Sequence, residues 1–132
     1  METFQVKTKK LKDVVDLTSK LHSIIQKREF QNGLCHVFLP HTTAALTTGE
    51  LGEGTEEDFL EVAEKIIPQI RFRHAHDPSH AWSHMAGSLI GASLTLPVID
   101  GELRVGTWQS VLLVELDGPR ERQLVVGLTS VA

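Results

Sequence analysis

The sequence has one cysteine, no tyrosine and no long apolar run among its 132 residues. The lone Cys35 excludes an intrachain disulfide framework, and its apolar neighbours favour a buried, inert thiol in a reducing compartment. No apolar stretch approaches the about 20 residues of a membrane-spanning helix, and the N-terminus lacks the apolar segment of a signal peptide. The sequence therefore predicts a cytoplasmic protein with no membrane partner.

The chain has fewer basic than acidic residues, and its formal net charge is -4 at pH 7. General binding of nucleic acid requires a basic surface, so we expect no nucleic-acid partner. Hydrophobic residues make up 41% of the chain and charged residues 23%, as in ordinary globular proteins. A chain of this length can bury a real core, and the sequence predicts a single domain over residues 1–132.

Hydrophobic periodicity predicts an α+β fold with two main helices and a mixed, largely antiparallel sheet. One helix is expected from Asp13, as its cap, to near Arg28. The second is expected to begin with a capping box between Thr55 and Asp58, to bury Val62 and Ile66, and to end at about Pro68. Strands are expected over residues 4–8, 34–39, 41–48, 94–99, 103–105, 111–116 and 124–131. Residues 71–83 lack hydrophobic periodicity, which predicts a long loop with a functional role.

Histidine is the type in excess, with seven in this short chain. Residues 71–84 hold four of them: His74, His76, His80 and His84. Imidazole is a common ligand of divalent metals and titrates near neutral pH. His80 and His84 would share one face of a helical turn and could hold one ion, although a surface tract would have the same composition.

Other chemically capable residues lie at predicted strand ends and beside a predicted helix. His41 and the hydroxyls of Thr42 and Thr43 follow a buried strand, either as a hydrogen-bonded structural group or as part of a site. Trp108 offers an aromatic face, and either Arg120 or Arg122 offers a planar fork of donors for phosphate. Each also has a purely structural interpretation, as a core tryptophan or an exposed ion pair. The acidic residues 50–58 suit a helix N-terminus and could supply a metal ligand.

Several blocks together resemble one family in order and spacing. The blocks are His41-Thr42-Thr43-Ala44, His84 with Ser88-Leu89-Ile90-Gly91, Gly106-Thr107-Trp108-Gln109 and Glu115-Leu116-Asp117-Gly118-Pro119-Arg120. They resemble the YjbQ family, also called the secondary thiamine-phosphate synthase enzyme family, over essentially the whole chain. Two positions depart from the common family pattern: Gly49 stands where relatives commonly carry Asn, and His80 also stands in place of Asn.

The resemblance implies a homotrimer with an α+β fold and a site near the subunit interface. It also implies thiamine-phosphate synthase activity, in which an aminopyrimidine methyl diphosphate condenses with a thiazole phosphate and pyrophosphate leaves. On this basis the expected catalytic residues are His41, His84, Asp58 and Arg120. The expected substrate-binding residues are Thr42, Thr43, Trp108, Gln109 and Arg120.

A divalent metal, zinc or magnesium, is a further expectation, with His41, His74, His80 and His84 as candidate ligands. Such an ion and the basic groups would stabilise the leaving pyrophosphate. Two alternatives stay open at this point. One is a metal-dependent hydrolase of a phosphorylated metabolite, and the other is a non-catalytic trimer that binds a metal or a small anion.

Overall fold

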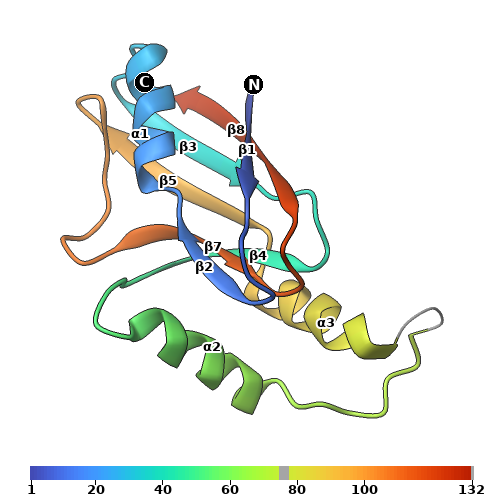
Figure 1. Ribbon diagram of the computed structural model, residues 1–132. Coiled ribbons are helices and arrows are strands. Elements are labelled where there is room, and N and C mark those ends of the chain that lie inside the picture. The colour runs from blue at the N-terminus through green and yellow to red at the C-terminus, as the bar shows by residue number, and fades with distance from the viewer. Residues whose placement is uncertain (75–77, 132) are drawn as a thin grey trace.

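The computed structural model describes residues 1–74 and 78–131, and within them eight strands form two antiparallel sheets (Figure 1). The larger sheet has the order β1-β8-β3-β5-β6, from strands Glu2–Lys7, Glu121–Ser130, Gly33–Phe38, Ser93–Ile99 and Glu102–Leu103. The smaller sheet has the order β2-β7-β4, from strands Asp13–Asp16, Ser110–Glu115 and Ala44–Gly49. Every strand pairing described is antiparallel.

The helices are α1 (Thr18–Lys27), α2 (Thr55–Ile66) and α3 (Ala81–Ile90), and a short 3-10 turn, Pro78–His80, precedes α3. Helix α1 crosses one side of the larger sheet, whereas α2 and α3 lie beside the smaller sheet (Figure 1). No helix among the described residues is long and apolar enough to cross a membrane. The α+β class expected from the sequence is confirmed, with three helices rather than two main ones.

The smaller sheet separates two hydrophobic clusters because its side chains alternate between two faces. Leu46 and Leu113 face the main core, which α1 and the larger sheet complete. Ala45 and Val114 face the other way, into a smaller cluster that contains Trp82 of α3. The Trp82 indole N–H donates to the carbonyl of Ile67, 2.6 Å away, which ties α3 to the segment after α2. Strands β4 and β7 are thus covered on both faces.

The first helix starts later in the chain than the sequence analysis predicted. Asp13–Asp16 is strand β2, and its two valines pair with β7, in keeping with the preference of β-branched residues for strands. Helix α1 starts only at Thr18, whose backbone N–H donates to the Asp16 carboxylate at 2.9 Å. The prediction of Asp13 as the helix cap is therefore wrong, and Asp16 supplies the carboxylate near the helix start.

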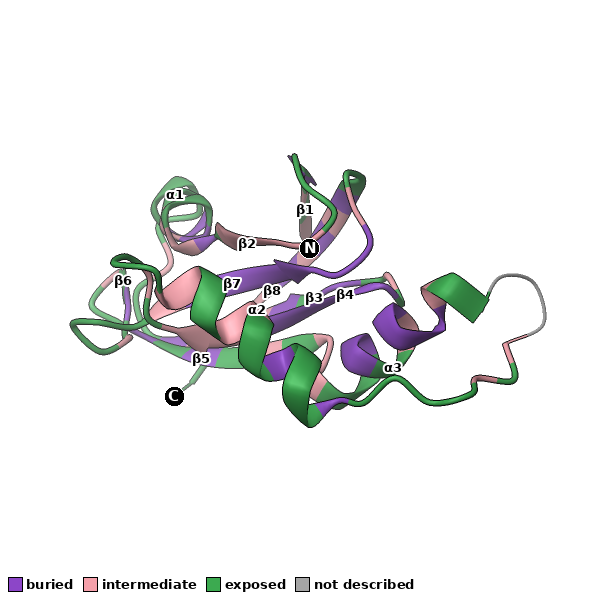
Figure 2. Cartoon of the chain, turned by 60° about the horizontal axis from the view of Figure 1, so that its bottom comes forward, coloured by how far each residue is buried: buried purple, intermediate pink, exposed green. Residues whose placement is uncertain are grey.

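The second predicted helix is present, but its cap and its buried face differ from the prediction. Gly54 takes the cap position with a φ of 84°, and no side-chain cap hydrogen bond forms. The Thr55 hydroxyl donates backward to the carbonyl of Gly52 instead. Val62 and Ile66, expected inside, are exposed, because α2 contacts the fold along a narrow stripe that includes Ala63 (Figure 2).

Helix α3 is the element that the sequence analysis missed. Its mean apolar character is high and its amphipathic pattern is weak, so periodicity did not reveal it. The predicted loop over residues 71–83 is therefore wrong for Ala81 to Ser83, which form the first turn of α3. His76, named among the candidate histidines, lies outside the described residues. Buried Gly87 allows α3 to pack directly against the chain that leads into β4.

We predict that Gly87→Ala destabilises the fold, although alanine favours a helix more than glycine does. An added Cβ would lie 2.6 Å from the Thr42 carbonyl oxygen and 3.2 Å from that of Ala44. Overpacking of this kind costs about 1–3 kcal/mol, and urea denaturation measures it. The exposed Ser88→Ala on the same helix is the control, and equal stability of the two variants would contradict this packing.

Candidate active site

The candidate site lies where β4 begins and β7 ends. The antiparallel register pairs Ala44 with Glu115 at this end, and Gly49 with Ser110 at the other. Residues 41–43, which precede β4, therefore meet residues 117–122, which follow β7. Trp108 and Gln109 precede β7 and so lie at the opposite end, roughly 17 Å of strand away at about 3.4 Å per residue.

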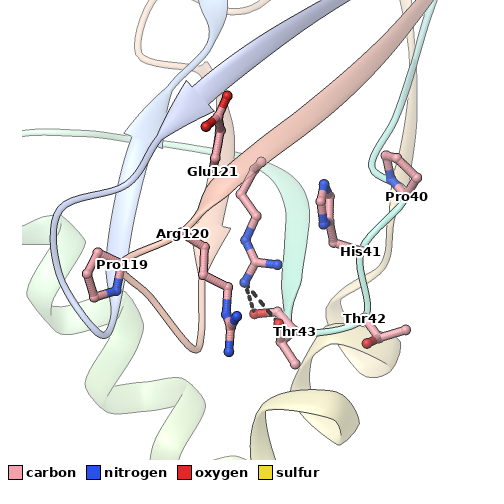
Figure 3. Close-up of a pocket in the computed structure, with 8 residues that line it drawn as sticks. Pro40, His41, Thr42, Thr43, Pro119, Arg120 and Glu121 are labelled. Carbon is pink, nitrogen blue, oxygen red and sulfur yellow. Dashed lines mark hydrogen bonds between the residues drawn. The ribbon is translucent and has the colours of Figure 1, made fainter.

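A cavity of about 590 Å³ opens at this end of the smaller sheet. Its lining is polar and comes from two segments: Pro40, His41, Thr42 and Thr43, and Pro119, Arg120, Glu121 and Arg122. Figure 3 shows that the side chains of Arg120 and Glu121 point in opposite directions at the start of β8. The structure thus brings together His41, Thr42, Thr43 and Arg120 of the predicted site residues.

An ion pair between Glu115 and Arg122 lies beneath this cavity, and both side chains are almost fully buried. The Arg122 Nε donates to one carboxylate oxygen at 2.8 Å, and its terminal nitrogen donates to the other. The same terminal nitrogen donates to the carbonyl and hydroxyl oxygens of Thr43, at 3.0 and 2.9 Å. This bidentate pair fixes the wall of the cavity at Thr43.

The Glu115 carboxylate is stabilised in its charged form by its other partners as well. The Thr8 hydroxyl donates to it at 2.8 Å, and the backbone N–H groups of Leu116 and Asp117 donate at 3.1 Å. Burial by itself raises the pKa of Glu115, but the hydrogen bonds from Arg122, Thr8 and the backbone together lower it below its ordinary value. The positive charge of Arg122 is therefore neutralised inside the protein.

His41 is held as a neutral imidazole. Its Nε2 accepts a hydrogen bond from the backbone N–H of Gln123 at 2.9 Å, so the neutral ring carries its proton on Nδ1. Desolvation and the positive charge of Arg122 lower the pKa of His41, against the opposing effect of Glu115. The ring can donate a hydrogen bond through Nδ1 to a ligand in the cavity.

Asp117 holds two of the predicted site residues together. Its Oδ2 accepts a hydrogen bond from Arg120 at 3.0 Å and lies 2.8 Å from Nδ1 of His80. The Arg120 Nε also donates to the Asp117 carbonyl at 2.7 Å. Arg120 is half-exposed at the cavity while Asp117 is nearly buried, so the carboxylate fixes the guanidinium in place. His80 is thereby joined to the site through Asp117.

The other predicted metal ligands do not converge on the cavity. His74 and His84 stack on each other, with ring centroids 5.0 Å apart, and His41 uses Nε2 for Gln123. Within residues 1–74 and 78–131, no three histidine, cysteine or acidic side chains are arranged to hold a metal ion. The described part of one chain thus supplies no ligand set for zinc or magnesium.

The remaining predicted residues lie at the far end of β7. Trp108 is 77% exposed and lines a separate cavity of about 310 Å³ with Glu50, Glu53 and Thr55. Gln109 accepts from the backbone N–H of Gly106 at 3.0 Å and donates to the Thr48 hydroxyl at 3.2 Å. Asp58 is exposed in the first turn of α2. One chain therefore does not bring Trp108, Gln109 and Asp58 to His41 and Arg120.

Three residues at or next to this site had no functional role in the sequence analysis: Glu115, Asp117 and Phe38. Glu115 and Asp117 stand in the block ending at Arg120, and two carboxylates so close to arginines were a usable signal for ion pairs. Phe38 ends a buried strand, and no sequence pattern showed that its ring stays exposed.

A family model described as "UPF0047 protein YjbQ-like" matches residues 2–130 of the chain. The chain belongs to this family. A UPF0047 protein of Archaeoglobus fulgidus is 38% identical over 122 residues, which cover 92% of this chain and 94% of the relative. A UPF0047 protein of Mycobacterium tuberculosis is 38% identical over 111 residues, which cover 81% of this chain and 84% of the relative.

Two solved structures of similar sequence have the same fold. A hypothetical protein of Aeropyrum pernix is 37% identical, with a TM-score of 0.90 and coverage of 98% of this chain and 99% of the other. An uncharacterised conserved YjbQ/UPF0047 protein of Clostridium acetobutylicum is 30% identical, with a TM-score of 0.89 and coverage of 98% and 100%. The family resemblance and the fold expected from the sequence are confirmed.

We predict that Glu115→Gln lowers the free energy of unfolding by about 3 kcal/mol at pH 7, because it leaves Arg122 buried without a countercharge. The folded-state pKa of Glu115 lies below its ordinary value of 4.5. The ion pair's stabilisation is therefore fully present above pH 4.5 and is lost as the pH falls through the folded-state value. Urea denaturation from pH 7 to pH 3 measures both effects.

The exposed neighbour Glu121→Gln is the matched control, with a change expected within about 0.5 kcal/mol. The difference between wild type and Glu115→Gln should shrink in acid. A constant difference across this pH range would contradict the charged state of Glu115.

Proposed function

We propose that the protein binds a small phosphorylated metabolite in the cavity between His41 and Arg120, and that it catalyses a thiamine-phosphate synthase-type condensation there. The observation that carries the binding proposal is the Arg120 guanidinium, half-exposed at the cavity and fixed by the carboxylate and carbonyl of Asp117. The choice of reaction rests on membership of the family that the sequence resembles.

Arg120 is the cation suited to an anionic ligand, because Arg122 is buried against Glu115. Asp117 occupies Nε and one terminal nitrogen of Arg120, which leaves N–H groups on the exposed edge of the guanidinium. A guanidinium whose orientation is already fixed loses less rotational freedom when it binds phosphate. Arg120 would therefore contact a phosphate or diphosphate oxygen.

His41 and Thr42 would complete the contacts to the anion. A neutral His41 with its proton on Nδ1 donates one hydrogen bond and presents no negative charge. The Thr42 hydroxyl is exposed and lines the same cavity. Thr43 serves as a wall residue instead, because its hydroxyl accepts from Arg122.

The condensation itself demands stabilisation of a leaving group. The bond between the pyrimidine methylene carbon and the diphosphate oxygen breaks, and its electron pair leaves with pyrophosphate. The thiazole nitrogen then supplies the electron pair of the new carbon–nitrogen bond. Hydrogen-bond donors placed at the departing oxygens lower the barrier electrostatically. Arg120 and His41 would be these donors.

A divalent metal, zinc or magnesium, stays a prediction from the sequence. When bound, such an ion would stabilise the charge of the leaving diphosphate. The four candidate histidines do not form a ligand set in the described part of one chain, so no step of the proposed reaction depends on it.

Assembly into a homotrimer is part of the proposal. Large apolar side chains stay exposed on and after α2 and on α3, among them Val62, Ile66, Ile70, Met85 and Leu89. Subunit association would bury such side chains. We also propose a cytoplasmic location, which suits the buried thiol of Cys35, whose pKa desolvation raises to about 11.

We predict that Arg120→Ala slows the condensation 10- to 100-fold, the effect of losing one charge-assisted hydrogen bond to the departing anion, about 1.5–3 kcal/mol. The measurement is formation of thiamine phosphate and pyrophosphate from the two substrates. His84→Ala tests the second expected catalytic histidine in the same assay. Unchanged rates in both variants would overturn the assignment.

Arg104→Ala removes the same charge from an exposed position directly after β6 and is the matched control. Release of inorganic phosphate from one phosphorylated substrate alone would favour the hydrolase instead. Binding of the phosphorylated substrates with no turnover would favour the non-catalytic module. Parallel assays with magnesium and with a chelator measure any dependence on a divalent ion.

We predict that the protein sediments as a trimer of about three times its 14.6 kDa chain mass. Burial of apolar side chains from α2 and α3 is the expected driving force. Ile66→Glu should weaken the trimer because it would place a charge in the contact. Sedimentation as a monomer at tens of micromolar would contradict this part of the proposal.

A further inference from the structure

A second cavity of about 300 Å³ adjoins the first one. Pro40, His41 and Thr42 line both cavities, so this short segment is their common wall. The remaining lining of the second cavity comes from the end of β3, from α3 and from the start of β5: Phe38, Leu39, Gly87, Ser88 and Ala92. A ligand held at His41 can therefore extend into either space.

The two spaces differ in chemistry. Around the first cavity lie two arginines, a glutamate and two threonines. No charged side chain lines the second cavity, because the shared His41 is neutral, and Phe38, Leu39 and Ala92 supply apolar atoms. Together they suit a ligand with an anionic end and an apolar, flat end.

Phe38 is the aromatic side chain available to such a ligand. It ends β3 on the side of the larger sheet that faces away from the core, and it is 49% exposed. Buried Leu39 and the backbone of Gly87 lie in the same lining. Trp108, which the sequence analysis expected to face the substrate ring, lines a different cavity at the far end of β7.

We propose that the second cavity is the ring subsite of the phosphorylated substrate, with Phe38 as the residue that recognises the ring while Arg120 holds the phosphate. The phosphate half of this inference rests on the proposed function, whereas the ring half rests on the second cavity. The ring stacks on the exposed phenyl face, and His41 lies between the two halves of the ligand. Phe38 thus takes the role that the sequence analysis gave to Trp108.

The test is a binding titration followed by NMR or calorimetry with three probes. The probes are a hydroxyethylthiazole phosphate, the same thiazole alcohol without phosphate, and inorganic phosphate. Phe38→Ala should weaken binding of both thiazoles about 3- to 10-fold and leave inorganic phosphate unchanged, because only the thiazoles carry a ring. Arg120→Ala should weaken both phosphates and leave the alcohol unchanged.

Two further variants guard against a general loss of structure. Phe38→Leu keeps an apolar side chain but removes the ring, and it should weaken the thiazoles while its melting temperature stays near that of wild type. Ile99→Ala removes an apolar side chain of similar exposure from the other end of the larger sheet and should bind all three probes normally.

The outcomes separate the two proposals. Thiazole alcohol binding that depends on Phe38, with no phosphate effect of Arg120, would overturn the proposed function and keep the ring site. The ring site is overturned if Phe38→Ala leaves thiazole binding unchanged, if it weakens inorganic phosphate equally, or if Trp108→Ala is the variant that weakens the thiazoles. Failure of wild type to bind either thiazole also overturns it.

Discussion

The buried ion pair between Glu115 and Arg122 is the interaction on which the rest of this end of the molecule depends. Glu115 ends β7, Arg122 follows the start of β8, and Thr43 precedes β4, so the pair joins both sheets at one point. Thr8 adds the segment after β1. Two charges are costly to remove from water unless their geometry and hydrogen bonds are good, and here the carboxylate has partners on both oxygens. The same requirement fixes the chain around the cavity.

This arrangement also decides which charge is presented to a ligand. Because Glu115 neutralises Arg122, the second arginine, Arg120, is the one that reaches the cavity edge, and Asp117 fixes its direction. His41 is kept neutral by desolvation and by the nearby Arg122. The site therefore combines a fixed cation, a neutral donor and hydroxyl groups, which is a chemistry for binding an anion. His80 reaches this array through its contact with the Asp117 carboxylate.

Sequence patterns predicted most of the sheet, because a strand with one buried face carries an apolar side chain at every second residue. They failed at β2 and α3 for different reasons. At β2, the valines next to Asp13 fit an apolar helical stripe equally well, and pairing with β7 decided between them. At α3, a largely apolar helix surrounded by histidines and glycines lacks a polar stripe, and its packing depends on the close approach of Gly87 to Thr42. Tertiary packing outweighed local pattern in both places.

The sequence by itself determined the family and the α+β class, and it supplied the candidate residues for an anion site, because these follow from residue types, spacing and periodicity. Only the tertiary structure decided which of them meet. Register between β4 and β7 sends His41 and Arg120 to one end and Trp108 to the other, since antiparallel strands bring the start of one beside the end of its neighbour. The four histidines predicted as metal ligands divide in the same way: one ring lies at the cavity, one contacts Asp117, and two stack on each other. An exposed Phe38 beside the cavity follows from chain geometry that no local pattern encodes.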